Sequence, residues 1–168
     1  MMTEKIIEKM IVLYNGNLKD INHFIKVFTF ASLIGKLESV DESTQRILEI
    51  AAIVHDISCP LCRQKYGNTN GKLQEEESEP LLRDFLEEFE LPKHVEERII
   101  FLVGHHHTYS NVEGLDYQIL LEADFLVNAG ESSKYSLAVD SFREKVFKTP
   151  SGRRLLDEMY GTSSGRNR

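Results

Sequence analysis

Apolar residues recur three, four and seven positions apart along almost the whole chain, and alternating β-branched and polar runs are nearly absent. The first pattern places apolar side chains on one face of a helix, whereas a half-buried strand requires strict alternation. The sequence therefore predicts an all-α fold. A chain of 168 residues can bury a core without disulfides, and we see no internal repeat. We expect a single-domain helical bundle over residues 1–161, followed by a disordered tail over residues 162–168.

The expected helix boundaries follow from capping residues and helix breakers. Ser39 and Glu42 have the spacing of a capping box, and Thr149-Pro150 and Gly161 are typical of a helix start and a helix end. The expected helices cover 3–14, 20–35, a segment from the Ser39–Glu42 box to His55-Asp56, 76–89, a segment from Leu91-Pro92 towards His106, a segment from Asp116, and 149–161.

The stretch from Ser58 to Lys72 contains one proline, two glycines and two asparagines. Because these residue types mark turns and loops, we expect a loop there, covering the end of the preceding helix. The only two cysteines, Cys59 and Cys62, lie in this stretch. Two thiolates supply half of a structural zinc shell, so we expect both to be reduced and not to bind metal.

The formal net charge of -7 and the lack of a Lys/Arg cluster argue against a nucleic-acid polymer as partner. The longest apolar stretches are short and interrupted by charge, so we expect no membrane span, no signal peptide and a cytoplasmic protein. A small phosphorylated molecule remains compatible with an acidic chain, because a bound divalent ion can reverse the local charge.

Four ionisable side chains fall on, or at the ends of, the inward faces of three expected helices: His23, His55, Asp56 and Asp124. Taken singly, a buried histidine is most often a hydrogen-bonded core residue, and an aspartate at a helix end is most often a cap. Taken together, two buried carboxylates near two imidazoles need a partner for their charge. Nitrogen and oxygen ligands of this kind suit a first-row divalent ion.

Three segments of the chain resemble the HD-domain metal-dependent phosphohydrolases, in the order that this family shows. They are Ile21-Asn22-His23-Phe24, Ile53-Val54-His55-Asp56-Ile57 and Leu121-Glu122-Ala123-Asp124-Phe125-Leu126, and the resemblance spans most of the chain. It extends to small bacterial-type HD-domain proteins through the segment from Lys65-Tyr66-Gly67 to Lys72-Leu73-Gln74-Glu75 and through His106-His107-Thr108-Tyr109. The resemblance implies a helical bundle in which His23, His55, Asp56 and Asp124 bind the metal.

The chain departs from the two-metal members of this family at one position. Where those members carry an additional histidine after the His-Asp pair, this chain has Gln74. We therefore expect one divalent ion, with Mn, Fe, Co, Ni, Zn and Mg all open. Helical phase places His106 on the core face and leaves His105 and His107 off it. The alternative for this triple histidine is a solvated helix end that meets terminal carbonyls.

We expect such a site to hydrolyse a phosphoester or phosphoanhydride with metal-activated water. Glu75 and His106 are the candidates for general acid or base, although a run of glutamates also suits a helix N-terminus. Candidate substrate contacts are Arg63, Lys65, Lys72 and Gln74, although surface lysines often bind nothing specific. Two other functions remain open, an HD-fold di-iron oxygenase and a non-catalytic module that binds metal or nucleotide. The sequence does not identify the substrate, which could be a nucleotide or another small phosphorylated metabolite. It also does not give the oligomeric state.

Overall fold

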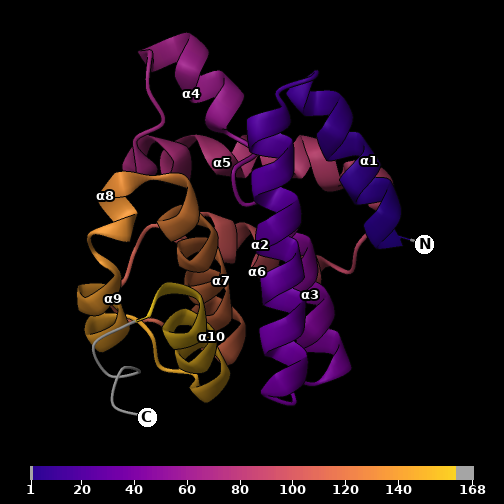
Figure 1. The fold of residues 1–168 in the computed structure, drawn as a ribbon. Helices are drawn as coiled ribbons and strands as arrows, with labels where there is room; N and C mark the ends of the chain where they lie inside the picture. Colours follow the sequence, from indigo (N-terminus) through magenta and orange to yellow (C-terminus); the bar gives the residue numbers. More distant parts are fainter. Residues whose placement is uncertain (1, 162–168) are drawn as a thin grey trace.

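The computed structural model describes residues 2–161 of the chain. The elements in this range are all helices, as Figure 1 shows, and the all-α prediction is confirmed. They are α1 (Met2–Tyr14), α2 (Leu18–Leu37), α3 (Glu42–Val54), α4 (Cys59–Tyr66), α5 (Gly71–Leu86), the 3₁₀ helix η1 (Glu87–Phe89), α6 (Lys93–Val103), α7 (Leu115–Glu131), α8 (Ser133–Ser136), α9 (Val139–Lys145) and α10 (Pro150–Tyr160). The expected tail over 162–168 lies outside the described residues. Within 2–161, no helix has both the length and the apolar character needed to cross a membrane.

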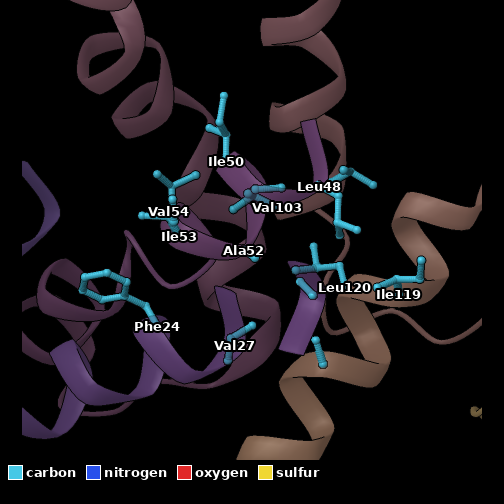
Figure 2. Packing of buried hydrophobic residues seen from close by; sticks show 14 of the residues in the cluster. Phe24, Val27, Leu48, Ile50, Ala52, Ile53, Val54, Val103, Ile119 and Leu120 are labelled. Atoms are coloured by element: carbon cyan, nitrogen blue, oxygen red, sulfur yellow. The ribbon is translucent and has the colours of Figure 1, made fainter. Parts of the chain in front are cut away.

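Helix α3 lies at the centre of the bundle, where it contacts α1, α2, α6 and α7. Its residues from Ile47 to Val54 are buried except Glu49, so the helix is apolar over most of its surface. Figure 2 shows this core, with side chains from four helices: Phe24, Val27, Leu48, Ile50, Ala52, Ile53, Val54, Val103, Ile119 and Leu120. Full burial of each larger apolar side chain contributes about 1.5–3 kcal/mol, so this packing fixes where the end of α3 lies.

Helix α7 is enclosed on most sides. It packs against α2 and α3 on one side and contacts α8 and α10. From Asp116 to Val127, Gln118 is the sole residue that is not buried. Because neighbouring helices surround α7, a polar side chain on the inner face of this helix is buried and has a fixed position. Asp124 is one of these side chains.

The expected loop from Ser58 to Lys72 is wrong, because most of it is helical. Helix α4 covers its first half, and α5 begins at Gly71, five residues before the expected start. Pro60 lies in the first turn of α4, where a missing N–H costs nothing, and Gly67 ends the helix in the left-handed region with φ 71°. Asn70 then caps α5. Proline, glycine and asparagine are common both in loops and at the ends of helices, which is why the sequence predicts a loop for this segment.

Other boundaries differ by smaller amounts. Asp41, and not Ser39, caps α3, since its carboxylate accepts a hydrogen bond from the Thr44 N–H at 3.0 Å. Helix α6 ends at Val103, before the three histidines, which lie in the turn that follows. Helices α8 and α9 occupy a segment for which the sequence indicated no element.

A buried carboxylate joins the C-terminal segment to the core. Glu122 of α7 has no exposed surface, and it accepts hydrogen bonds from the backbone N–H groups of Lys148 at 2.6 Å and Thr149 at 3.0 Å. The Thr149 hydroxyl and the Gln118 amide also donate to it. Burial raises the pKa of Glu122 despite these donors. The start of α10 is thus held against α7 by one side chain.

We expect Gly152→Ala to destabilise the protein. A Cβ at this position would lie 2.0 Å from Oε2 of Glu122 and 2.6 Å from Oγ1 of Thr149. Because Glu122 is fixed by its four donors, relieving the clash costs on the order of 1–3 kcal/mol of unfolding free energy. Urea denaturation measures this, with the exposed Glu158→Ala on the same helix as control, expected to stay within about 0.5 kcal/mol of wild type. Equal stability of the two variants would contradict the prediction.

Candidate metal centre

Three helices bring together the four side chains that the sequence analysis singled out. His23 comes from α2, His55 and Asp56 directly follow α3, and Asp124 comes from α7. Nε2 of His23 lies 3.2 Å from Nε2 of His55 and 3.2 Å from Oδ1 of Asp124. Oδ2 of Asp56 lies 3.5 Å from the first imidazole and 3.4 Å from the second. These nitrogen and oxygen atoms therefore lie close together at the end of α3.

The other nitrogen of each imidazole is already occupied. Nδ1 of His55 donates to the carbonyl oxygen of Ala52 at 2.8 Å, and Nδ1 of His23 lies 2.8 Å from Oε2 of Glu131. Since carbonyl and carboxylate oxygens only accept, both Nδ1 atoms carry the proton. The two Nε2 atoms of the neutral rings then point lone pairs at each other across 3.2 Å. A shared proton or a cation has to lie between them.

The electrostatics of the cluster agree with a cation. Burial lowers the pKa of His23, but hydrogen bonding and charge from Asp124 and Asp56 outweigh it and raise that pKa to about 9. The same carboxylates raise the pKa of the fully buried His55 well above its usual value. Conversely, the imidazoles hold the pKa of both carboxyls below the usual range, although burial alone would raise it. The carboxylates thus favour a positive charge beside them, and a divalent ion supplies such a charge. Two imidazole nitrogens and two carboxylates are also suitable donors for a divalent ion.

A second group of potential ligands shares Asp56. It consists of Asp56, His106 and His107, whose ligand atoms all lie within 4.8 Å of one another. Nε2 of His106 is 3.5 Å from Oδ1 of Asp56, while its Nδ1 donates to the carbonyl oxygen of Val103 at 2.7 Å. The Nε2 atoms of both histidines are buried without a hydrogen-bond partner. Buried polar atoms of this kind are uncommon, and these two face the cluster.

His107 corrects the sequence analysis, which placed it off the core face. That inference continued the phase of α6 through the triple histidine, but the helix ends at Val103. In the turn that follows, His107 reaches the site, where burial and the neighbouring His106 lower its pKa to about 3. The phase argument does hold for His105, whose ring stacks on Phe101 and whose Nδ1 donates to the Phe101 carbonyl.

A cavity of about 300 Å³ opens beside the converging ligands. Residues of α2, α4, α7 and α8 and the start of α5 line it, and they include His23, Asp56, Asp124 and His107. Three cationic side chains also line it: Lys19, Arg63 and Lys134. Nη1 of Arg63 pairs with Asp20 at 2.6 Å, whereas the structure gives the two lysines no carboxylate partner among residues 2–161. The mouth of an otherwise acidic site thus offers positive charge to an anion.

The four predicted substrate contacts divide into two pairs. Arg63 and Gln74 line the cavity. The Gln74 amide donates to the Thr69 carbonyl, while its own Oε1 is buried without a partner. Lys65 and Lys72 do not line the cavity: Nζ of the first is 2.5 Å from Glu77, and the second is largely exposed.

Glu75 holds the turn that carries the histidines. Its Oε1 accepts hydrogen bonds from the His107 N–H and the Thr108 hydroxyl, both at 3.0 Å. It is not among the residues that line the cavity. Of the two predicted acid or base candidates, His106 lies beside Asp56, and Glu75 contacts the backbone of the turn.

Sequence reasoning missed two further residues of α7. Asn128 donates to Oδ1 of Asp124 at 2.8 Å, and Glu131 contacts His23. Both line the cavity. They follow Asp124 by four and seven positions, so all three share one helix face. The spacing could have indicated them, but it does not show that α2 lies opposite this face.

The two cysteines are free and buried, and neither belongs to a group of potential metal ligands within residues 2–161. Cys59 lines the cavity beside Asp56, and burial raises the pKa of its thiol. A protonated thiol is a poor ligand and a poor nucleophile. Their expected reduced, non-ligating state remains a prediction.

Comparison with protein families matches the chain over residues 20–141 to the family described as HD domain. The match covers more than half of the chain and contains all the residues of both ligand groups. The chain matches no curated protein and no solved structure.

Proposed function

Because the chain belongs to the HD-domain family, whose members are mostly metal-dependent hydrolases, we propose that it is a metal-dependent phosphohydrolase. Its substrate in this proposal is a phosphoester or phosphoanhydride of a nucleotide or another small phosphorylated metabolite. The observation that carries the proposal is the pair of Nε2 atoms of His23 and His55, 3.2 Å apart between two carboxylates. This arrangement suits a cation and leaves one side open to the cavity.

One divalent cation is held in this proposal by His23, His55, Asp56 and Asp124. When bound, such an ion lowers the pKa of water and neutralises charge on phosphate oxygens. The protein contributes a rigid ligand set, since α2, α3 and α7 pack against one another along their lengths. Asn128 adds a hydrogen bond that keeps Oδ1 of Asp124 in place.

His106 is the candidate for proton transfer. It is buried, its Nδ1–H is held by the Val103 carbonyl, and its free Nε2 lies 3.5 Å from Asp56. A neutral imidazole with a free Nε2 can accept a proton from water or return one to a leaving oxygen. Glu75 supports it from behind through the His107 N–H. Because Glu75 does not line the cavity, it has this supporting role in the proposal in place of direct proton transfer.

The cavity favours a small anionic substrate. About 300 Å³ is at the lower end of the range for small-molecule sites. Lys19, Arg63 and Lys134 can neutralise phosphate charge at the mouth. The unpartnered Oε1 of Gln74 can accept a hydrogen bond from a hydroxyl or amino group of the substrate.

The second ligand group supports a second candidate, a centre with two metal ions. Asp56 would belong to both ligand sets, since one of its oxygens lies near His55 and the other near His106. Together the two groups and Asp124 supply six His and Asp side chains, the number that an HD-fold di-iron oxygenase needs. In this candidate, His107 supplies the histidine that the sequence lacks at Gln74.

Metal analysis of the purified protein, followed by a screen for phosphate release from nucleotides and generic phosphoesters, tests the proposal. One Mn, Co, Ni or Zn ion per chain with phosphate release would support it. Two irons per chain with oxygen-dependent turnover would support the oxygenase instead. Loss of the fold on chelation, with no turnover of any phosphoester, would indicate a non-catalytic module.

A further inference from the structure

His23 differs from His55 and His106 in the partner of its Nδ1 atom, which is a charged side chain. Its Nδ1 lies 2.8 Å from Oε2 of Glu131, the last residue of α7. The imidazoles of His55 and His106 instead donate to carbonyl oxygens of the helices that precede them. A helix carbonyl cannot be removed by a substitution, whereas a glutamate can. The orientation of His23 therefore depends on one replaceable residue.

Glu131 is itself held in place. Its second oxygen, Oε1, lies 2.9 Å from Nζ of Lys26, which follows His23 by three positions on α2. The carboxylate therefore contacts two side chains of one face of α2, and its side chain is 21% exposed. The Lys26 side chain is 53% exposed, so this ion pair by itself stabilises little. Its effect is to keep Oε2 directed at the imidazole.

We propose that Glu131 is a positioning residue for the metal centre. It accepts the Nδ1–H of His23, so the proton stays on Nδ1 and the lone pair of Nε2 points towards His55 and Asp124. A carboxylate behind a ligating histidine also increases the basicity of the ligand, and removal of such a partner lowers metal affinity ten- to a hundredfold. This proposal rests on the metal site proposed above, but it does not depend on hydrolysis.

The test compares Glu131→Ala and Glu131→Gln with wild type, using Zn²⁺ alone as the probe. We expect Glu131→Ala to weaken Zn²⁺ binding by about ten- to a hundredfold in competition with a chelator. Glu131→Gln keeps an accepting oxygen, so its affinity should lie between the two. Nitrogen-15 NMR of labelled histidine is recorded for both proteins without metal and at alkaline pH, where the imidazole is neutral. It should show Nδ1–H on His23 in wild type and a mixture of tautomers in Glu131→Ala.

Glu49→Gln is the matched control. Glu49 of α3 is partly buried and also joins its helix to α2, through the Ser32 hydroxyl, while the Gln45 amide donates to the same oxygen. We expect its Zn²⁺ affinity to equal that of wild type. Unchanged affinity and tautomer in Glu131→Ala would overturn the proposal, and so would an equal loss in Glu49→Gln. Zn²⁺ binding that follows the expected order, without release of phosphate by any variant, would overturn the hydrolase proposal alone.

Discussion

Asp124→Ala is expected to abolish metal retention and phosphate release together while the helices stay folded. The substitution removes the carboxylate whose Oδ1 lies 3.2 Å from His23 and 3.5 Å from His55. Metal ions contribute several kcal/mol to stabilising the charge of a transition state. At 1.36 kcal/mol per factor of ten, turnover should fall by about 10²-fold or more.

The fold should survive, because the neighbours of Asp124 on α7 keep their apolar contacts. Circular dichroism of the metal-free proteins, together with metal analysis and a phosphate assay, separates the two effects. Asp84→Ala on the exposed face of α5 serves as the control and should behave as wild type. Full turnover with bound metal in Asp124→Ala would show that the ligand set is misassigned.

His106→Gln is expected to retain the ion held by the other four residues and to lose turnover by roughly 10²–10⁴-fold, the usual contribution of a general acid or base. Glutamine is of similar size and places its amide near the position of Nε2, but it offers no group that accepts and releases protons. The measurement is turnover at saturating substrate, with metal content determined on the same sample.

The neighbouring histidine provides a matched control. His105 has the same chemistry one position earlier, but it stacks on Phe101 and contacts neither ligand group. His105→Gln should therefore keep full turnover. If His106→Gln keeps full turnover as well, its proposed role in proton transfer fails. If it loses one of two bound ions, the two-metal candidate replaces the one-metal site.

The helical fold and the meeting of four polar side chains could be predicted, for one physical reason. His23 and Asp124 interrupt apolar faces, and burying them is unfavourable unless they share a partner. Apolar periodicity locates such interruptions without any knowledge of the tertiary structure. The structure brings these two residues together with His55 and Asp56.

Helix α4 could not be predicted because proline and glycine are favourable both at helix ends and in loops. Pro60 is favourable in the first turn of a helix, and Gly67 is favourable just after the last turn. In a sequence, the same residues also indicate a loop. Only eight residues lie between the ends of α4, too few for a clear apolar period.

His107 and Glu131 were missed for different reasons. The position of His107 depends on where α6 ends, and boundaries are the least certain part of a sequence-based assignment. Glu131 matters because α2 packs against α7, a contact between segments 108 positions apart. Helical spacing shows which residues share a face, but it does not show which other helix that face meets.

Phosphate release by one preparation, measured before metal removal, after chelation and after repletion, tests the central claim most directly. The account predicts that the metal-free protein keeps its helical content and releases no phosphate. One equivalent of a divalent ion per chain should restore turnover in wild type but not in Asp124→Ala. Unchanged phosphate release by protein shown to contain no metal would contradict the account.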